Sequence, residues 1–325
     1  AHGSYPQTYM MLDIAALQHM YGADYETNSG DTVYSWEPNS GDTLVDGAIA
    51  IDASAVNIFA TIWDGGGFDT YDLSAYRTDL DIDLNPGGFS LLSTAQTANL
   101  GHGNFARGNV YNARLFEGNP ASLIESVIGG AGDDRIVGNG ANNHLYGGKG
   151  NDSLFGGAGD DILYGGTRDD ILSGETGADI FVIELDAGHD QILDFEDGVD
   201  RIEFHGGAFR FANLSIFQDG DDTVIKSENG VLTLVGIDAA SIDASDFMFV
   251  LLSESPAYAS KATPANQSTP LDIQRLTEFD GTHYTHDADI LAEFFSKNIP
   301  RSQDLPTQVS VEMPILEFDD FFRDL

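Results

Sequence analysis

The sequence predicts an all-β protein built around a parallel β-roll, with flanking antiparallel β-sandwich strands, a short N-terminal helix and a partly helical C-terminal tail. Three observations carry this prediction: a nine-residue repeat in the middle of the chain, short alternating apolar runs on both sides of it, and Asp-Gly and Asn-Gly turns after it. The formal net charge of −39, from 53 acidic and 14 basic residues, excludes nucleic acid as a partner and disfavours anionic membranes.

The repeat region runs from Gly129 to Val182 and contains six consecutive nonapeptides. Each approximates G-G-x-G-x-D-x-U-x, where U is large and apolar, a pattern typical of calcium-binding parallel β-helices. A flexible Gly/Asp-rich linker is the alternative, but the strict phase argues against it. If two nonapeptides form one coil, alternate strands fill a thin core with the U residues. These are Ile136, Leu145, Leu154, Leu163, Leu172 and Phe181.

The sixth position of each repeat supplies an oxygen ligand, and these residues are Asp134, Asn143, Asp152, Asp161, Asp170 and Asp179. A hard cation takes six to eight oxygens, so one residue per turn is too few and stacked turns have to share ions. The expected pairs are Asp134 with Asp152, Asp152 with Asp170, Asn143 with Asp161, and Asp161 with Asp179. Glycines allow main-chain carbonyls to approach the ion, and the expected positions are Gly130, Gly132, Gly148, Gly150, Gly157 and Gly159. We therefore expect several calcium ions.

Three repeats depart from the pattern, and we expect weaker sites in them. The second has Ala141 and Asn143, the fifth has Arg168, and the sixth has Glu175 and Ala178.

Two acidic stretches precede the repeats. In WDGGGFDT, Asp64 and Asp69 flank three glycines, which makes a plausible hard-cation loop, with an acidic hairpin turn as the alternative. Asp79, Asp81 and Asp83 imitate the start of a calcium loop, but they alternate with apolar residues and lack the glycine and glutamate that such a loop needs. We expect a half-buried strand with an acidic outer face.

The segment after the repeats predicts ordinary β-structure that covers the open end of the roll. Hairpin turns are expected at Asp197-Gly198, Asp219-Gly220 and Asn229-Gly230. Two interpretations of Asp190, Asp194 and Asp200 stay open: an extension of calcium binding or a solvated acidic surface.

Helical spacing appears at both ends of the chain. Residues 10–21 predict a short amphipathic helix that ends at Gly22. After about residue 252, a Ser/Ala/Pro-rich linker leads to a second helical pattern, HDADILAEFFSKNI, and to the acidic, aromatic end MPILEFDDFFRDL. The end favours either an uncleaved secretion signal or a partner-binding tail. His283 and His286 are expected to be solvated.

Several segments together resemble one family. The segments are TYMMLDIAALQHMYGADYETNSGDTVYSW, FATIWDGGGFDTYDLS, LIESVIGGAGDD, DAGHDQILDFEDGVDRIEF and SDFMFV. Together they look like the C-terminal RTX calcium-binding β-roll domain of serralysin-type (peptidase M10, metzincin) secreted metalloproteases. The resemblance implies calcium ligands at Asp64, Gly66, Gly67, Asp69, Leu123 (by its carbonyl) and Glu125, with Asn28 and Gly30 at a further ion.

The resemblance also implies a domain organisation. Residues 1–24 correspond to a remnant helix of a metzincin-like catalytic domain, 25–128 to pre-roll strands with the calcium loop, 129–182 to the roll, 183–251 to capping β-structure, and 252–325 to a linker and tail. The family's zinc motif H-E-x-x-H does not occur in these 325 residues, so no catalytic residue is carried over and no zinc is expected in this chain.

These observations favour a non-catalytic, calcium-binding C-terminal module of a serralysin-like secreted metalloprotease. It would fold on calcium binding outside a bacterial cell and support type I secretion and stability. The expected partners are calcium, the catalytic domain and the secretion machinery, without membrane insertion. The N-terminal AHGSYPQ lacks the features of a cleavable signal, and cysteine is absent, which suits export without oxidation. The alternative is a stand-alone extracellular RTX calcium-binding or adhesive protein without protease activity.

Overall fold

The computed structural model describes residues 5–53, 55–184, 188–205, 210–227 and 230–250. All of them belong to one compact unit, Ala1–Gln267. The linker, the second helical pattern with His283 and His286, and the acidic end expected after residue 252 lie outside the described residues.

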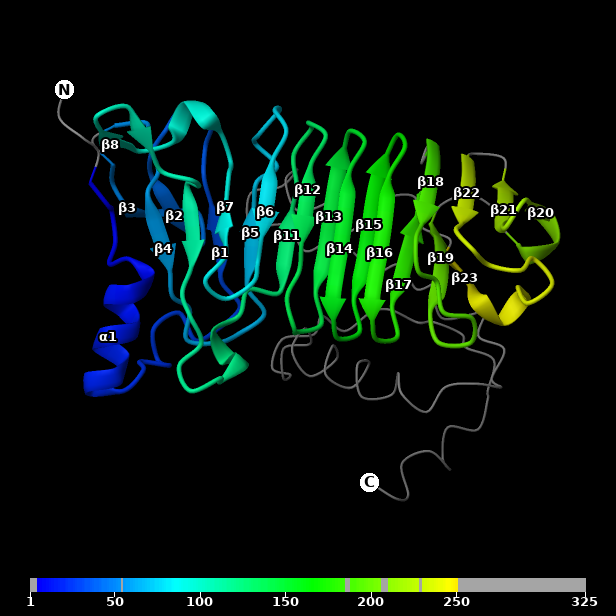
Figure 1. The fold of residues 1–325 in the computed structure, drawn as a ribbon, viewed down its shortest axis with the longest axis horizontal. Coiled ribbons are helices and arrows are strands. Elements are labelled where there is room, and N and C mark those ends of the chain that lie inside the picture. The colour runs from blue at the N-terminus through cyan, green and yellow to red at the C-terminus, as the bar shows by residue number, and fades with distance from the viewer. Residues whose placement is uncertain (1–4, 54, 185–187, 206–209, 228–229, 251–325) are drawn as a thin grey trace, which may run out of the picture. The chain divides into compact units, whose positions relative to one another are not determined.

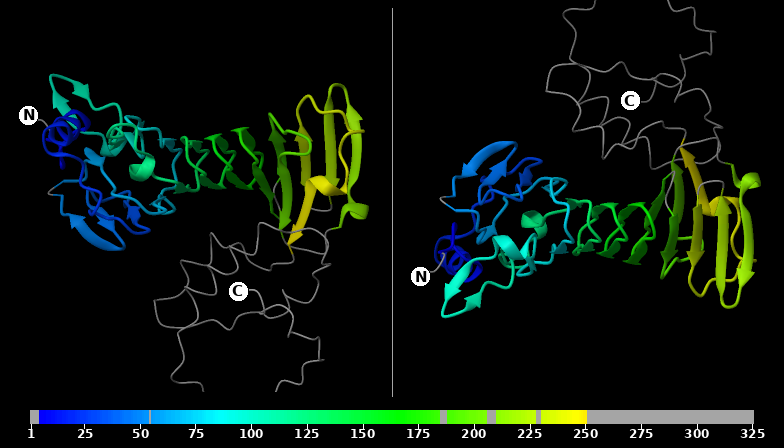
Figure 2. Two further views of the ribbon diagram at one scale, coloured as in Figure 1. Left: turned by 90° about the horizontal axis from the view of Figure 1, so that it is seen from below. Right: turned by 90° about the horizontal axis from the view of Figure 1, so that it is seen from above.

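The six repeats form two parallel sheets that face each other, as the ribbon shows (Figures 1 and 2). Successive strands alternate between the two sheets. One sheet contains β13 (His144–Lys149), β15 (Ile162–Thr167) and β17 (Ile180–Ile183). The other contains β12 (Arg135–Val137), β14 (Ser153–Ala158) and β16 (Ile171–Thr176). Leu145 pairs with Leu163, and Leu154 pairs with Leu172. Two nonapeptides therefore make one coil, and the predicted parallel β-roll is confirmed.

The core of the roll is a single layer of side chains between the two sheets. All six U residues are 0% exposed, from Ile136 to Phe181. Because side chains alternate along a strand, the residue on either side of each U residue points away from this core. The thin core therefore uses one large apolar residue per repeat, as the sequence predicts.

Strands that precede the repeats continue both sheets. β11 (Ser126–Ile128), β5 (Thr70–Asp72) and β1 (Val33–Ser35) extend the first sheet with parallel pairing. β6 (Asp81–Asp83) extends the second sheet beside β12. Ile82 is buried in β6, whereas Asp81 is exposed, which confirms a strand with an acidic outer face instead of a calcium loop.

Further short strands complete the N-terminal end. β2 (Thr43–Val45) and β3 (Ala48–Ile51) follow β1 in the first sheet. A separate sheet contains β4 (Ala60–Ile62), β10 (Val110–Asn112) and β7 (Phe89–Ser90), and a small hairpin contains β8 (Asn99–Gly101) and β9 (Asn104–Phe105). Short 3-10 turns lie at Thr94–Gln96 (η1) and Pro120–Ser122 (η2).

The C-terminal strands cover the other end of the roll. The first sheet is extended by β19 (Arg201–His205) and β23 (Phe247–Val250). The second sheet is extended by β18 (Gly188–Ile192), β22 (Gly230–Leu234), β21 (Asp222–Ser227) and β20 (Ser215–Asp219). Short 3-10 turns lie at Phe211–Asn213 (η3) and Ala244–Asp246 (η4). The hairpin at Asp219-Gly220 is confirmed. Asn229 lies outside the described residues.

The prediction of a hairpin turn at Asp197-Gly198 is wrong. The strands on either side of it, β18 and β19, belong to different sheets, so this turn carries the chain from one wall of the roll to the other. Gly198 has a φ of 76°, which a hairpin turn and this crossing both accept.

The predicted N-terminal helix is α1 (Met11–Tyr21) and ends at Gly22, whose N–H donates to Gln18 O at 2.8 Å. Its expected apolar face is not covered by the described residues. Leu12 is 68% exposed and Met20 is 61% exposed, whereas Gln18 is the buried residue of the helix. Within the described ranges, no helix combines the length and apolar character that a bilayer crossing requires.

Candidate cation-binding corners

The sixth-position side chains lie at the corners of the roll and form two ladders. In the first corner ladder, the N–H of Asp134 donates to Asp152 Oδ1 at 2.7 Å, and the N–H of Asp152 donates to Asp170 Oδ1 at 2.7 Å. In the second corner ladder, the main-chain N–H of Asn143 donates to Asp161 Oδ1 at 2.6 Å, and the main-chain N–H of Asp161 donates to Asp179 Oδ1 at 2.8 Å. The structure thus brings together all four residue pairs that the repeat pattern predicts.

Both ladders continue beyond the repeats. The N–H of Leu80 donates to Asp134 Oδ1 at 2.8 Å. At the other end, the main-chain N–H of Asp170 donates to Asp190 Oδ1 and the main-chain N–H of Asp179 donates to Asp200 Oδ1, both at 3.0 Å. Asp190 and Asp200 are 3% and 4% exposed, so they are not part of a solvated surface. Asp194 is partly exposed and accepts the N–H of Gly174.

Sequence reasoning left the roles of Asp190 and Asp200 open, although a signal was present. Each is followed two residues later by a buried apolar residue, Ile192 or Ile202, as in the repeats. The signal was weak because insertions change the spacing between stacked aspartates. It is 18 residues within the repeats, but 20 from Asp170 to Asp190 and 21 from Asp179 to Asp200.

The middle of the ladders contains carboxylate oxygens without a donor. Oδ2 of Asp152, Asp161 and Asp170 is buried and has no hydrogen-bond partner among the described residues. Burial, followed by the charge of neighbouring carboxylates, raises the pKa of Asp152 and Asp161 to about 7 and that of Asp170 to about 8. An unpaired buried oxygen of this kind is costly unless a proton or a cation satisfies it.

Asp134, at the start of the first ladder, differs from these three residues. Its Oδ1 accepts the N–H of Leu80, and its Oδ2 accepts the N–H of Gly130 at 2.7 Å. Burial raises its pKa to about 6, less than for Asp152. The demand for a cation is therefore greatest in the inner coils.

Glycines make these corners possible in two ways. The first glycine of a repeat, such as Gly156, lies against the carboxylate of the same repeat, so that a side chain there would collide with Asp161 Oδ2. The second and fourth glycines have positive φ, and examples are Gly148 (111°), Gly150 (129°), Gly157 (114°) and Gly159 (117°). In the first repeat, Gly130 and Gly132 lack this conformation but pack against main-chain atoms of Tyr76 and of Thr78 and Asp79.

Two non-glycine residues adopt the same positive-φ conformation. Arg168 replaces the fourth glycine of the fifth repeat with a φ of 89°, and Glu175 replaces the second glycine of the sixth with a φ of 67°. The coil geometry is therefore kept at these positions at a conformational cost. The expected weakness of these sites stays a prediction.

A second group of carboxylates lies in the loop between β4 and β5. Asp64 Oδ1 accepts the N–H of Gly66 at 2.7 Å, and Asp69 Oδ1 accepts the N–H of Thr32 at 2.8 Å. The N–H of Asp69 donates to Glu125 Oε2 at 2.9 Å. Burial raises the pKa of Asp69 to about 8 and that of Glu125 to about 7. The structure thus assembles Asp64, Asp69 and Glu125, as the sequence-based interpretation expects.

The remaining predicted loop residues lie beside this group. Gly66 and Gly67 have φ of 134° and 148°, and a side chain at Gly67 would collide with Gly30 O. Leu123 is buried directly after η2, and its N–H donates to Pro120 O at 3.0 Å. The group is therefore held by main-chain bonds as well as by its carboxylates.

Tyr34 is part of this group but was not predicted to be. Its hydroxyl donates to Asp64 Oδ2 at 2.7 Å and accepts from Asn28 Nδ2 at 2.8 Å. Burial, followed by the hydrogen bond to Asp64, raises the pKa of Tyr34 well above its usual value. In sequence, Tyr34 is one of many tyrosines, and only its position in β1 places it here.

The donor atoms fit a hard cation. Within the described residues, no group of three or more His, Asp or Glu side chains is arranged to hold a metal ion, and the chain has no cysteine. The corners instead offer carboxylates in pairs, buried Oδ2 atoms without a donor among the described residues, and a glycine-rich main chain. Carboxylate and carbonyl oxygens are the ligands of calcium, whereas transition metals prefer imidazole or thiolate.

Fold and corners together define a class of protein: a two-walled parallel β-roll with a ladder of aspartates along each row of corners. The sequence model of the family described as Peptidase M10 serralysin C terminal matches residues 23–254. The chain therefore belongs to the serralysin C-terminal family.

Curated relatives include serralysin C of Dickeya chrysanthemi, which is 41% identical over 133 residues, 41% of this chain and 23% of that protein. Serralysin of Proteus mirabilis is 37% identical over 41% of this chain and 23% of its own. Metalloprotease AprA of Pseudomonas entomophila is 33% identical over 40% of this chain and 22% of its own. The matched part thus spans less than a quarter of each relative.

Solved structures that show similarity to this chain include an epimerase subunit and a lipase. The AlgE6R3 subunit of the Azotobacter vinelandii mannuronan C5-epimerase is 31% identical and covers 48% of this chain and 95% of its own, with a TM-score of 0.30. The extracellular lipase LipA of Serratia marcescens is 20% identical and covers 68% of this chain and 38% of its own, with a TM-score of 0.33.

Proposed function

We propose that the chain is a calcium-binding, non-catalytic C-terminal module of a serralysin-like secreted metalloprotease. The observation that carries the proposal is the set of buried, unpaired Oδ2 atoms of Asp152, Asp161 and Asp170 at stacked corners. Calcium at the corners satisfies these oxygens and neutralises carboxylates that otherwise repel one another. The same ion class suits the loop with Asp64 and Asp69, where Asp69 Oδ2 is likewise buried without a partner among the described residues.

Coupling between calcium and folding follows from the charge of the chain. With a formal net charge of −39, the protein in a calcium-poor cytosol carries strong self-repulsion, which disfavours the compact state. Where calcium is plentiful, binding to the folded state alone stabilises that state by mass action. Such a module stays loose during type I export, folds outside the cell and supports the stability of the protease.

The surface of α1 supports the assignment as a module of a larger protein. Leu12, Met20 and Tyr21 are exposed on the helix, and Tyr9 beside it is 69% exposed. Large apolar side chains grouped in this way are typical of a surface that contacts another domain. We propose that they contact the catalytic part of the protease.

The proposal is tested by a calcium titration of the purified chain. Circular dichroism should show a large gain of β-structure when calcium replaces a chelator, and native mass spectrometry should show several bound ions. A chain that is equally ordered in chelator, with no ions bound, would sink the proposal. The gene sequence upstream of the Ala1 codon distinguishes the protease module from the alternative, a stand-alone calcium-binding protein. An in-frame H-E-x-x-H supports the module, and its absence supports the stand-alone protein.

A further inference from the structure

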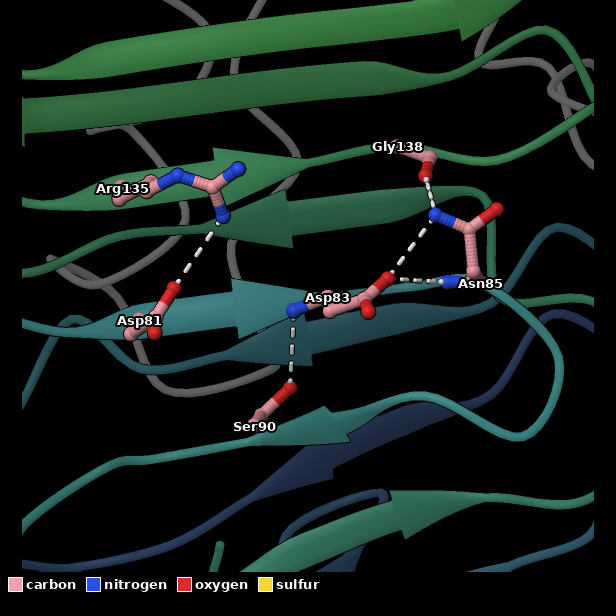
Figure 3. Close-up of polar contacts among 6 residues, drawn as sticks. All are labelled: Asp81, Asp83, Asn85, Ser90, Arg135 and Gly138. Atoms are coloured by element: carbon pink, nitrogen blue, oxygen red, sulfur yellow. Dashed lines mark hydrogen bonds and ion pairs between the residues drawn. The ribbon is translucent and has the colours of Figure 1, made fainter. Parts of the chain in front are cut away.

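The junction between the pre-roll strands and the first two repeats is held by three side-chain amides. Asn139 Nδ2 donates to Ile124 O at 2.8 Å and to Leu84 O at 3.4 Å. Asn143 Nδ2 donates to Glu125 O at 3.1 Å. Asn85 Nδ2 donates to Gly138 O at 3.0 Å, as Figure 3 shows. We call Asn85, Asn139 and Asn143 the amide joint.

The hydrogen-bond partners fix the orientation of each amide. Asn143 Oδ1 accepts the N–H of Asn139 at 2.7 Å, and Asn139 Oδ1 accepts the N–H of Ala141 at 2.9 Å. Asn85 Nδ2 also donates to Asp83 Oδ1 at 2.9 Å (Figure 3). Reversing any of these amides would place oxygen against oxygen. Asn139 is 3% exposed and Asn143 is 0% exposed, so water does not offer an alternative partner.

The joint connects both walls of the roll to the strands before it. Ile124 and Glu125 lead into β11 in the first sheet, whereas Leu84 and Asn85 follow β6 in the second. The N–H of Leu84 also donates to Val137 O at 2.9 Å. An exposed ion pair between Arg135 and Asp81, at 3.3 Å, lies beside it (Figure 3).

The joint differs chemically from the corners further along the roll. There, carboxylate oxygens lack donors, which a cation can satisfy. Here, NH2 groups point at the carbonyls of Ile124 and Glu125, and a hydrogen-bond donor repels a cation. The space between the Glu125 turn and the Asn143 turn is therefore already closed by neutral hydrogen bonds. The next corner, between Asn143 and Asp161, keeps the unpaired Oδ2 of Asp161.

We propose that the amide joint is a calcium-independent connection, which excludes calcium from the corner between Glu125 and Asn143. It holds the first coil to the pre-roll strands when calcium is absent, and the later coils add to this end when calcium arrives. The inference rests on the proposed calcium-dependent function for the later coils. It concerns a corner where the residues do not fit the ion.

Hydrogen exchange of the full chain in a chelator tests the connection directly. Peptides covering residues 122–145 should exchange at least about tenfold more slowly than peptides covering residues 150–179, because their hydrogen bonds need no ion. Equal exchange of the two regions in chelator would overturn the proposal. Equally fast exchange would show that the joint does not hold the first coil, whereas equally slow exchange would show that the later coils are ordered without calcium and would contradict the proposed function.

A double variant tests the exclusion of calcium. Asn139→Gly with Asn143→Asp restores the repeat pattern, removes both inner amides and adds a carboxylate. Native mass spectrometry in calcium should show one more ion than in the unmodified chain, and the slow exchange of residues 122–145 in chelator should be lost. An unchanged ion count together with unchanged exchange would overturn the proposal. An unmodified chain without any ion would instead contradict the proposed function.

Asn142→Asp is the matched control. It makes the same chemical change one residue away, and its exposed Oδ1, which accepts the N–H of Asp160 at 2.9 Å, stays an acceptor. It should change neither the ion count nor the exchange. If the double variant does not fold in calcium, Asn85→Ala decides: exchange of residues 135–145 in chelator should become faster at an unchanged ion count, and unchanged exchange would count against the joint.

Discussion

The main-chain N–H of Asp152 donates to Oδ1 of Asp170, its counterpart one coil along the roll, at 2.7 Å, while Oδ2 of Asp170 has no partner among the described residues. The two oxygens of one carboxylate thus have different tasks. Oδ1 fixes the spacing of the coils through the backbone, and Oδ2 is left for a proton or a cation. The predictions below follow from this division and from the coil geometry around it.

Asp152→Ala and Asp161→Ala should each raise the calcium concentration at the midpoint of folding by about tenfold or more, because each removes a carboxylate shared by two sites. Asn143→Ala should shift the midpoint less, since it removes no charge. Circular dichroism during a calcium titration measures all three. Asp152→Asn is the control, because it removes the charge but keeps an acceptor for the N–H of Asp134. Equal midpoints for the three alanine variants would contradict the stacked-corner scheme.

The stability of the calcium-free protein should fall as the pH rises. Burial raises the pKa of Asp152 to about 7 and that of Asp170 to about 8 in the folded state, above the ordinary aspartate value of 3.8. The folded state therefore binds these protons more tightly than the unfolded chain, and the resulting stabilisation is complete below about pH 4 and is lost as the pH rises through about 7 to 8.

The melting temperature in chelator should accordingly drop between about pH 5 and about pH 8, and Asp170→Asn should flatten this dependence. Calcium competes with the same protons, so its affinity should rise over the same range. Differential scanning calorimetry with and without calcium measures both trends. A calcium-free melting temperature that increases toward pH 8 would show that the corner carboxylates do not hold protons in the folded state.

Leu163→Ala should destabilise the calcium-bound protein by about 3 kcal/mol, because it opens a cavity in a core only one side chain thick. Leu163 is 0% exposed. Ile162→Ala is the control, since Ile162 points away from the core and is partly exposed. Chemical denaturation in saturating calcium gives both values, and equal losses would contradict the two-walled packing.

Arg168→Gly should stabilise the calcium-bound protein by roughly 1 kcal/mol, since arginine at a φ of 89° carries a conformational cost that glycine avoids. Arg168→Ala removes the same side chain but keeps the Cβ atom, so it should give no gain. Denaturation curves of the two variants separate backbone strain from loss of charge. A larger gain from alanine than from glycine would assign the effect to the arginine charge.

The roll could be predicted from sequence because its rules are local. The period of nine fixes which residue is buried, and stacking every second repeat fixes which aspartates meet. These inferences need only the phase of the pattern and the oxygen requirement of a hard cation. Asp190 and Asp200 escaped a firm assignment because the phase is lost when insertions enter the turns.

Other features depend on contacts between segments that are far apart in the chain. Asn143 was interpreted as a weaker calcium ligand, but its amide faces Glu125, 18 residues earlier, and Asn139 reaches Leu84 across 55 residues. The Asp197-Gly198 turn has hairpin chemistry, yet the strands on either side of it lie in opposite walls. The limits of α1 were predictable, whereas the exposure of its apolar face was not.

The eighteen-residue coil has a consequence for how such a chain changes length. Duplicating or deleting two adjacent nonapeptides moves the C-terminal part by one strand spacing, about 4.8 Å, and leaves every later residue in its own wall. Removing a single nonapeptide sends each later strand to the opposite wall, so the C-terminal strands meet the wrong partners. Gene rearrangements that preserve this protein should therefore come in even numbers of repeats.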